Sequence, residues 1–80
     1  MNTSNYPNWS LYWLDGGTWR VVNYGRSSRY AFDSLESAKE RVAKGKNSDD
    51  KFGMNRVFRT QQIVIVRYDG PYQTKIECIM

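Results

Sequence analysis

The sequence predicts a small single α+β domain, in which a mainly antiparallel sheet of four to five strands has one helix packed on one face. Segments rich in strand-forming residues stand on both sides of a single stretch with helical periodicity. The length of 80 residues, with 40% hydrophobic content, suits one small core. We expect a flexible polar tail at 1–8 and one domain at 9–80, with two or three strands, a helix and then two strands.

The first two strands are expected on either side of Gly16-Gly17, at 9–15 and 18–24. A two-residue glycine loop between aromatic and β-branched runs is a strong hairpin signal. This loop would place Tyr12 opposite Val21, whereas a loop at Asp15-Gly16 would shift the register by one residue and exchange the faces. A third extended piece is expected at 29–32.

A helix is predicted over residues 34–44, because apolar residues there recur with helical spacing. Asp33 or Ser34 is the expected N-cap, and Asp33 with Glu36 matches a capping box. Gly45 is the expected stop signal. The predicted apolar stripe consists of Leu35, Ala38 and Val42.

A polar loop is expected at 46–55, with Phe52 and Met54 folding back to cover the core. The next segment, 57–68, contains the run "IVIV", which is typical of a central strand buried on both faces.

The last strand is expected at 73–79, after a turn at 69–72. Strict alternation would place Ile76 and Cys78 on one side of this strand and Lys75 and Glu77 on the other. We interpret Cys78 as a small core residue rather than a nucleophile.

The residue inventory argues against an enzyme. The chain has no histidine and one cysteine, so it lacks the residues of a Ser-His-Asp or Cys-His arrangement and of a zinc cluster. The loop containing Asn47, Asp49 and Asp50 has the wrong spacing for a calcium loop. We therefore expect no catalytic residues, no metal and no cofactor. No signal peptide or membrane span is visible, which predicts a soluble cytoplasmic protein without a membrane partner.

The hairpin is apolar on both faces, although only one face can meet the helix. One face carries Tyr12, Leu14, Trp19 and Val21. If that face belongs to the core, the other presents a set enriched in the residue types of binding hot spots. These candidate partner-binding residues are Trp9, Trp13, Arg20 and Tyr24. The reverse assignment remains open.

Arginines interleaved with aromatics suggest an alternative, a DNA- or RNA-binding sheet face. The net charge of +4 arises entirely from residues 41–80. The candidate nucleic-acid contacts are Arg20, Arg26, Arg29, Arg56, Arg59 and Arg67. The stretch "FDSLESAKERV" at 32–42 resembles the start of the packing helix in AP2-type and integrase-arm DNA-binding domains, although "IVIV" and the final hairpin are not part of that pattern. The likeness is carried by Phe32, Asp33, Ser34, Glu36 and Ala38.

These observations favour a non-enzymatic binding protein that acts as an inhibitor or regulator by docking on a protein target. Its size and aromatic content are similar in general style to compact phage-encoded proteins that block or redirect a host machine. The alternatives are the nucleic-acid-binding module and a self-associating structural protein, since an exposed aromatic face needs a partner.

Overall fold

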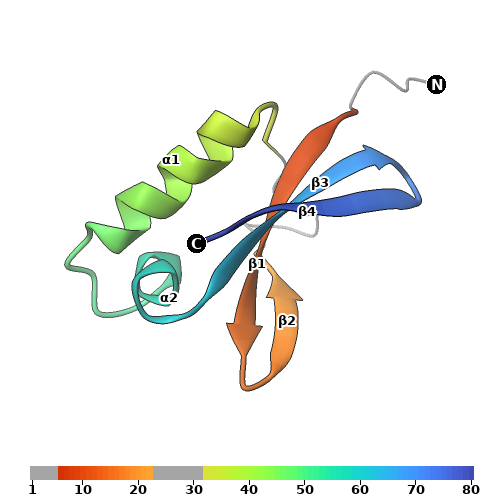
Figure 1. Cartoon of the computed structure of the whole chain (residues 1–80). Helices are drawn as coiled ribbons and strands as arrows, with labels where there is room; N and C mark the ends of the chain where they lie inside the picture. Colours follow the sequence, from red (N-terminus) through yellow and green to blue (C-terminus); the bar gives the residue numbers. More distant parts are fainter. Residues whose placement is uncertain (1–5, 23–31) are drawn as a thin grey trace.

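The computed structural model describes residues 6–22 and 32–80, and within them one four-stranded sheet has the order β2-β1-β3-β4 (Figure 1). Every neighbouring pair of strands is antiparallel. The sheet and its helices confirm the predicted α+β class. The strands are β1 (Asn8–Asp15), β2 (Thr18–Val21), β3 (Ile63–Gly70) and β4 (Gln73–Ile79).

The β1–β2 hairpin has the register expected for a Gly16-Gly17 loop. Tyr12 pairs with Val21, and Trp13 pairs with Arg20. Both loop glycines have positive φ, 58° and 94°, a backbone region that side chains disfavour and glycine adopts freely. Of the third extended piece expected at 29–32, only Phe32 lies within the described residues.

Two helices cover one side of the sheet, α1 (Leu35–Lys46) and α2 (Met54–Thr60) (Figure 1). The prediction of a single helix is therefore corrected by α2, which takes up the first part of the strand expected at 57–68. That strand, β3, begins only at Ile63. The segment becomes helical because Phe58 is completely buried in the core. Met54 also packs against the core as expected, whereas Phe52 is 85% exposed and does not fold back.

Helix α1 starts at the predicted place with one of the two predicted caps. Ser34 is the N-cap, and its hydroxyl accepts a hydrogen bond from the Ser37 amide at 3.1 Å. The predicted stripe is confirmed, since Ala38 and Val42 are fully buried and Leu35 packs against the core.

Gly45 does not end α1 but lies inside it, and the helix continues to Lys46. A Cβ atom built on Gly45 would lie 2.5 Å from Cδ2 and 2.7 Å from Cβ of Phe58. Glycine is therefore needed here for the close approach of α2 rather than as a stop signal. Arg41 of α1 also lies over the Phe58 ring, with its guanidinium carbon 4.8 Å from the ring centroid.

The core lies between this helical layer and the sheet. Trp9 and Trp13 are half-buried and pack against its edge. The strand β3 is an inner strand whose residues Ile63, Val64 and Ile65 are buried, which agrees with the prediction of a central strand with buried residues on both faces at that end. The buried hydrophobic cluster consists of Leu11, Val22, Phe32, Ala38, Val42, Phe58, Ile63 and Ile65.

Strand β4 occupies the range expected from the sequence but carries a bulge. Ile65 pairs with Cys78, whereas the next residue, Val66, pairs with Ile76, so Glu77 is an extra residue. Ile76 and Cys78 are consequently not on one side of the sheet, as strict alternation predicted. Cys78 packs against the core, and Ile76 points to the other face.

Candidate functional site: the open face of the sheet

The two faces of the sheet can be assigned from the register and the core. Leu11 belongs to the buried cluster and Trp13 packs against it, so the odd-numbered residues of β1 face the helices. Tyr12 and Leu14 face the other way. Pairing extends this face to Trp19 and Val21 on β2 and to Val64 on β3. We call it the open face, because both helices of the described residues lie on the opposite side (Figure 1).

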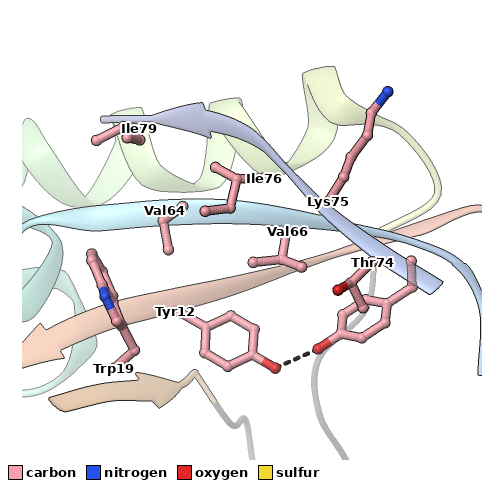
Figure 2. Close-up of a pocket in the computed structure, with 9 residues that line it drawn as sticks. Tyr12, Trp19, Val64, Val66, Thr74, Lys75, Ile76 and Ile79 are labelled. Carbon is pink, nitrogen blue, oxygen red and sulfur yellow. Dashed lines mark hydrogen bonds between the residues drawn. The ribbon is translucent and has the colours of Figure 1, made fainter. Parts of the chain in front are cut away.

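The open face contains a groove with a volume of about 480 Å³. Figure 2 shows its lining side chains, which come from all four strands. Aromatic and aliphatic side chains predominate, as in most binding sites of proteins. The groove is lined by Tyr12, Trp19, Val64, Val66, Tyr68, Thr74, Lys75, Ile76 and Ile79.

Three large apolar side chains of the groove are strongly exposed to solvent. Trp19 is 44% exposed, and Ile76 and Ile79 are each 63% exposed. They flank Val64, which is only 5% exposed and forms the floor between them. An apolar patch of this kind on a small domain marks an interaction surface or an aggregation risk.

The polar groups of the groove are few. The hydroxyls of Tyr12 and Tyr68 hydrogen-bond to one another, which joins β1 to β3 across one end of the groove (Figure 2). Thr74 adds a third hydroxyl, and Lys75 is the only charged residue among the described residues of the lining, with its ammonium group directed away from the groove toward Glu77 (Figure 2). The groove is therefore suited to bind apolar groups.

The predicted partner-binding residues lie mostly on the covered face. Trp9 and Trp13 are half-buried against the core, so the exposure expected of them is not found. Arg20 is exposed and forms an ion pair with Asp15 at 2.5 Å. Tyr24 lies outside the described residues. The structure thus adopts the reverse face assignment, because Leu11 and the Trp13 ring meet the core.

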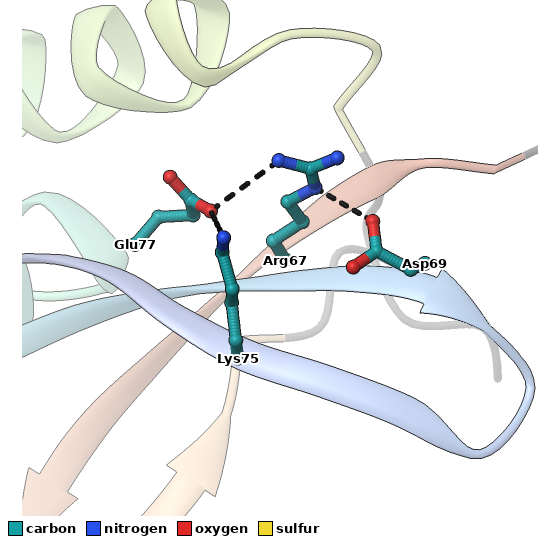
Figure 3. Close-up of polar contacts among 4 residues, drawn as sticks. All are labelled: Arg67, Asp69, Lys75 and Glu77. Atoms are coloured by element: carbon teal, nitrogen blue, oxygen red, sulfur yellow. Dashed lines mark hydrogen bonds and ion pairs between the residues drawn. The ribbon is translucent and has the colours of Figure 1, made fainter.

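Charged side chains gather on the helix side of β3 and β4 (Figure 3). Arg67 Nε donates to Asp69 Oδ1 at 2.7 Å, and Arg67 Nη1 lies 3.7 Å from Glu77 Oε2. Lys75 Nζ lies at the same distance from that oxygen. Arg67 also stacks near the Trp9 ring, 5.9 Å from its centroid. Glu77 therefore has two cationic partners.

The arginines proposed as nucleic-acid contacts come from several elements. Arg20 and Arg67 are each paired with acids, and Arg59 donates to the carbonyl oxygen of Ser48 at 2.8 Å. Arg56 is exposed on α2. Within the described part of the chain, none of these lines the groove. Arg26 and Arg29 lie outside the described residues.

Sequence reasoning missed the part of the groove contributed by β3 and β4. The run "IVIV" carried the signal, because a central strand with both faces apolar needs cover on both sides. Ile76 could not be found in this way, since its orientation depends on the bulge at Glu77.

Other possible site types find no support among the residues that the structure describes. These contain no group of three residues able to hold a metal ion. Neither of the two described helices has the length and apolar character needed to cross a membrane. Comparisons with protein-family models, curated proteins and solved structures find no match to this chain.

Proposed function

We propose that this protein is a non-catalytic binding protein that docks a protein partner on the open face of its sheet and acts as an inhibitor or regulator. The observation that carries the proposal is the apolar groove, with Trp19, Ile76 and Ile79 at its exposed rim. Tryptophan and tyrosine are enriched in binding hot spots, where they bury a large rigid area at low entropic cost.

The charges of the described chain support docking rather than chemistry. The chain contains no histidine, and the acids nearest the sheet, Asp15, Asp69 and Glu77, all face cations. A small domain of this kind can change the activity of a partner by covering a surface that the partner needs. Inhibition or regulation is the function that such covering performs.

The experiment is affinity capture from the cell that produces the protein, with matched variants. Ile76→Ser removes an exposed apolar side chain inside the groove. Tyr72→Ser is the control, because Tyr72 is 96% exposed in the β3–β4 turn and is not part of the groove lining. We expect a protein captured by the wild type and by Tyr72→Ser, and lost with Ile76→Ser. Equal capture by all three would refute docking on the open face.

The nucleic-acid alternative is tested with the same protein. Phosphate contacts make affinity fall steeply with salt. Binding of mixed oligonucleotides at low salt, with loss of affinity in Arg56→Ala and none in Ile76→Ser, would favour that alternative over the proposed docking.

A further inference from the structure

We infer that the basic end of the helical layer binds an acidic segment of a protein, and that this segment contributes an apolar side chain next to Phe52. The site comprises residues 41–61, which are the second half of α1, the loop after it and α2, and we call it the basic unit. The inference goes beyond docking on the open face, because both helices lie on the other side of the sheet (Figure 1).

The basic unit holds the whole charge excess of the protein. It contains six cations and two acids, a net charge of +4, whereas the rest of the chain has equal numbers of cations and acids. Gly45 of α1 lies against Phe58 of α2, and Arg59 donates to the carbonyl oxygen of Ser48 at 2.8 Å. Because these contacts hold the two helices and their loop together, the charges add to one local positive field.

Most of these cations have no acid beside them. Four are exposed and form no ion pair with an acid of the described residues, namely Lys44, Lys46, Lys51 and Arg56. The cations of the described strands differ, since each contacts a carboxylate. These paired cations are Arg20, Arg67 and Lys75. The charge of the basic unit is therefore available to an anionic ligand.

Helix stability explains only part of this arrangement. The helix dipole favours cations in the last turn, which accounts for Lys44 and Lys46 at the end of α1. Arg56 is the third residue of α2, where the same dipole disfavours a cation and no acid is present in the first turn. An anion supplied by a partner would offset this unfavourable placement.

An exposed aromatic side chain lies in the same unit. Phe52 is 85% exposed, and its neighbours Lys51 and Gly53 are exposed as well. Interfaces between proteins are enriched in aromatic residues at their centre and have polar residues at the rim. A ligand that matches the basic unit therefore presents both anionic and apolar groups.

Two features favour a protein segment over a nucleic acid. Asp49 and Asp50 directly precede Lys51 in the loop. A nucleic-acid strand carries a phosphate at every nucleotide, whereas a protein segment can place a neutral residue opposite these carboxylates. Single-stranded nucleic acids also bind by stacking successive bases on several aromatic side chains. In the basic unit Phe58 is buried, and Phe52 is the exposed aromatic.

The test measures the binding of three fluorescein-labelled probes to the whole protein by fluorescence anisotropy, at low and at high salt. The first probe is a peptide of alternating Glu and Ser with a central Trp. The second has Ser in place of that Trp, and the third is a single-stranded oligothymidylate with the same number of negative charges. We expect the Trp peptide to bind most tightly and its affinity to fall with salt.

Charge reversal locates the site. Lys51→Glu should weaken binding of the Trp peptide about three- to tenfold, and Lys39→Glu should weaken it less than about twofold. Lys39 provides the matched control because it is an exposed lysine of α1 outside the basic unit, so both variants have the same net charge. Equal weakening by both variants would overturn the inference, because overall charge alone would then attract the peptide.

Phe52→Ser tests the apolar contact. It should weaken binding of the Trp peptide about fivefold and leave binding of the Ser peptide unchanged. Tyr72→Ser should change neither, because Tyr72 is an exposed aromatic outside the basic unit. A loss of equal size for both peptides with Phe52→Ser would show that Phe52 makes no apolar contact and would contradict the inference.

Three other outcomes count against the inference. Neither peptide binds at low salt, or the oligothymidylate binds more tightly than the Trp peptide, in which case the occupant is a nucleic acid. The third is weakening of the Trp peptide by Ile76→Ser, which would place it in the groove of the open face. Since Ile76→Ser is expected to have no effect here, failure of this inference leaves the proposed docking function intact.

Discussion

Replacement of Gly45 by alanine tests the contact between the two helices. The new Cβ would lie 2.5 Å, 2.7 Å and 3.0 Å from three atoms of Phe58, where carbon atoms normally keep about 3.5–4.0 Å. Phe58 is fully buried, and two of the three atoms are close to its backbone, so rotation of the ring cannot relieve the overlap. Helix α2 must therefore move away from α1.

The expected magnitude follows from two opposing effects. Overpacking of a core costs typically about 1–3 kcal/mol, and the need to shift a helix places this case near the upper end. Alanine improves helix propensity over glycine by about 1 kcal/mol. Gly45→Ala should thus lower the free energy of unfolding by about 2 kcal/mol, which corresponds to a fall in Tm of roughly 8–16 °C for a domain of this size.

The assay is urea and thermal unfolding followed by circular dichroism, with Gly70→Ala as the matched control. A Cβ at Gly70 meets only the Cδ atom of Gln73, at an ordinary distance of 3.9 Å, and the backbone there has no positive φ. We expect the control to stay within about 0.5 kcal/mol of the wild type. If Gly45→Ala instead stabilised the protein by about 1 kcal/mol, propensity alone would be acting and the close packing of Phe58 on α1 would be refuted.

Three further substitutions test other parts of the structure by the same unfolding measurements. Ser34→Ala should cost about 1 kcal/mol by removing the N-cap of α1, and no loss would contradict the bond from the Ser37 amide. A double-mutant cycle of Tyr12→Phe and Tyr68→Phe should give a coupling of about 1 kcal/mol, whereas strictly additive effects would show that the two hydroxyls do not interact. Phe52→Ser should change stability by less than about 0.5 kcal/mol, because this side chain is 85% exposed, and a larger loss would show that it covers the core.

The local features of the β1–β2 hairpin could be predicted because they depend on neighbouring residues. The glycine pair selects the two-residue loop, and the loop fixes the pairing of Tyr12 with Val21. The choice of face could not be predicted in this way. Both faces are apolar, and the decision depends on how Leu11 meets residues that are distant in the sequence, such as Ile63 and Val42.

The second helix and the bulge could not be predicted from the sequence for a related reason, since both depend on contacts between distant residues. Helix α2 has seven residues and no side-chain cap at Gly53, and it contains a β-branched and aromatic pair, Val57-Phe58, a few residues before β3. Its local sequence favours a strand, and burial of Phe58 against α1 overrides that preference. The bulge at Glu77 has no glycine to mark it, so the alternation rule assigned Ile76 to the wrong side.

The most direct test of the central claim is site-specific photocrosslinking inside the producing cell. A photoreactive phenylalanine analogue is placed at Ile76 in the groove and, as the control, at Tyr72 in the exposed turn. We expect a defined protein to be crosslinked from position 76 and to be absent from position 72. Crosslinks of equal yield from both positions, or from position 72 alone, would contradict the assignment of the open face as the docking surface.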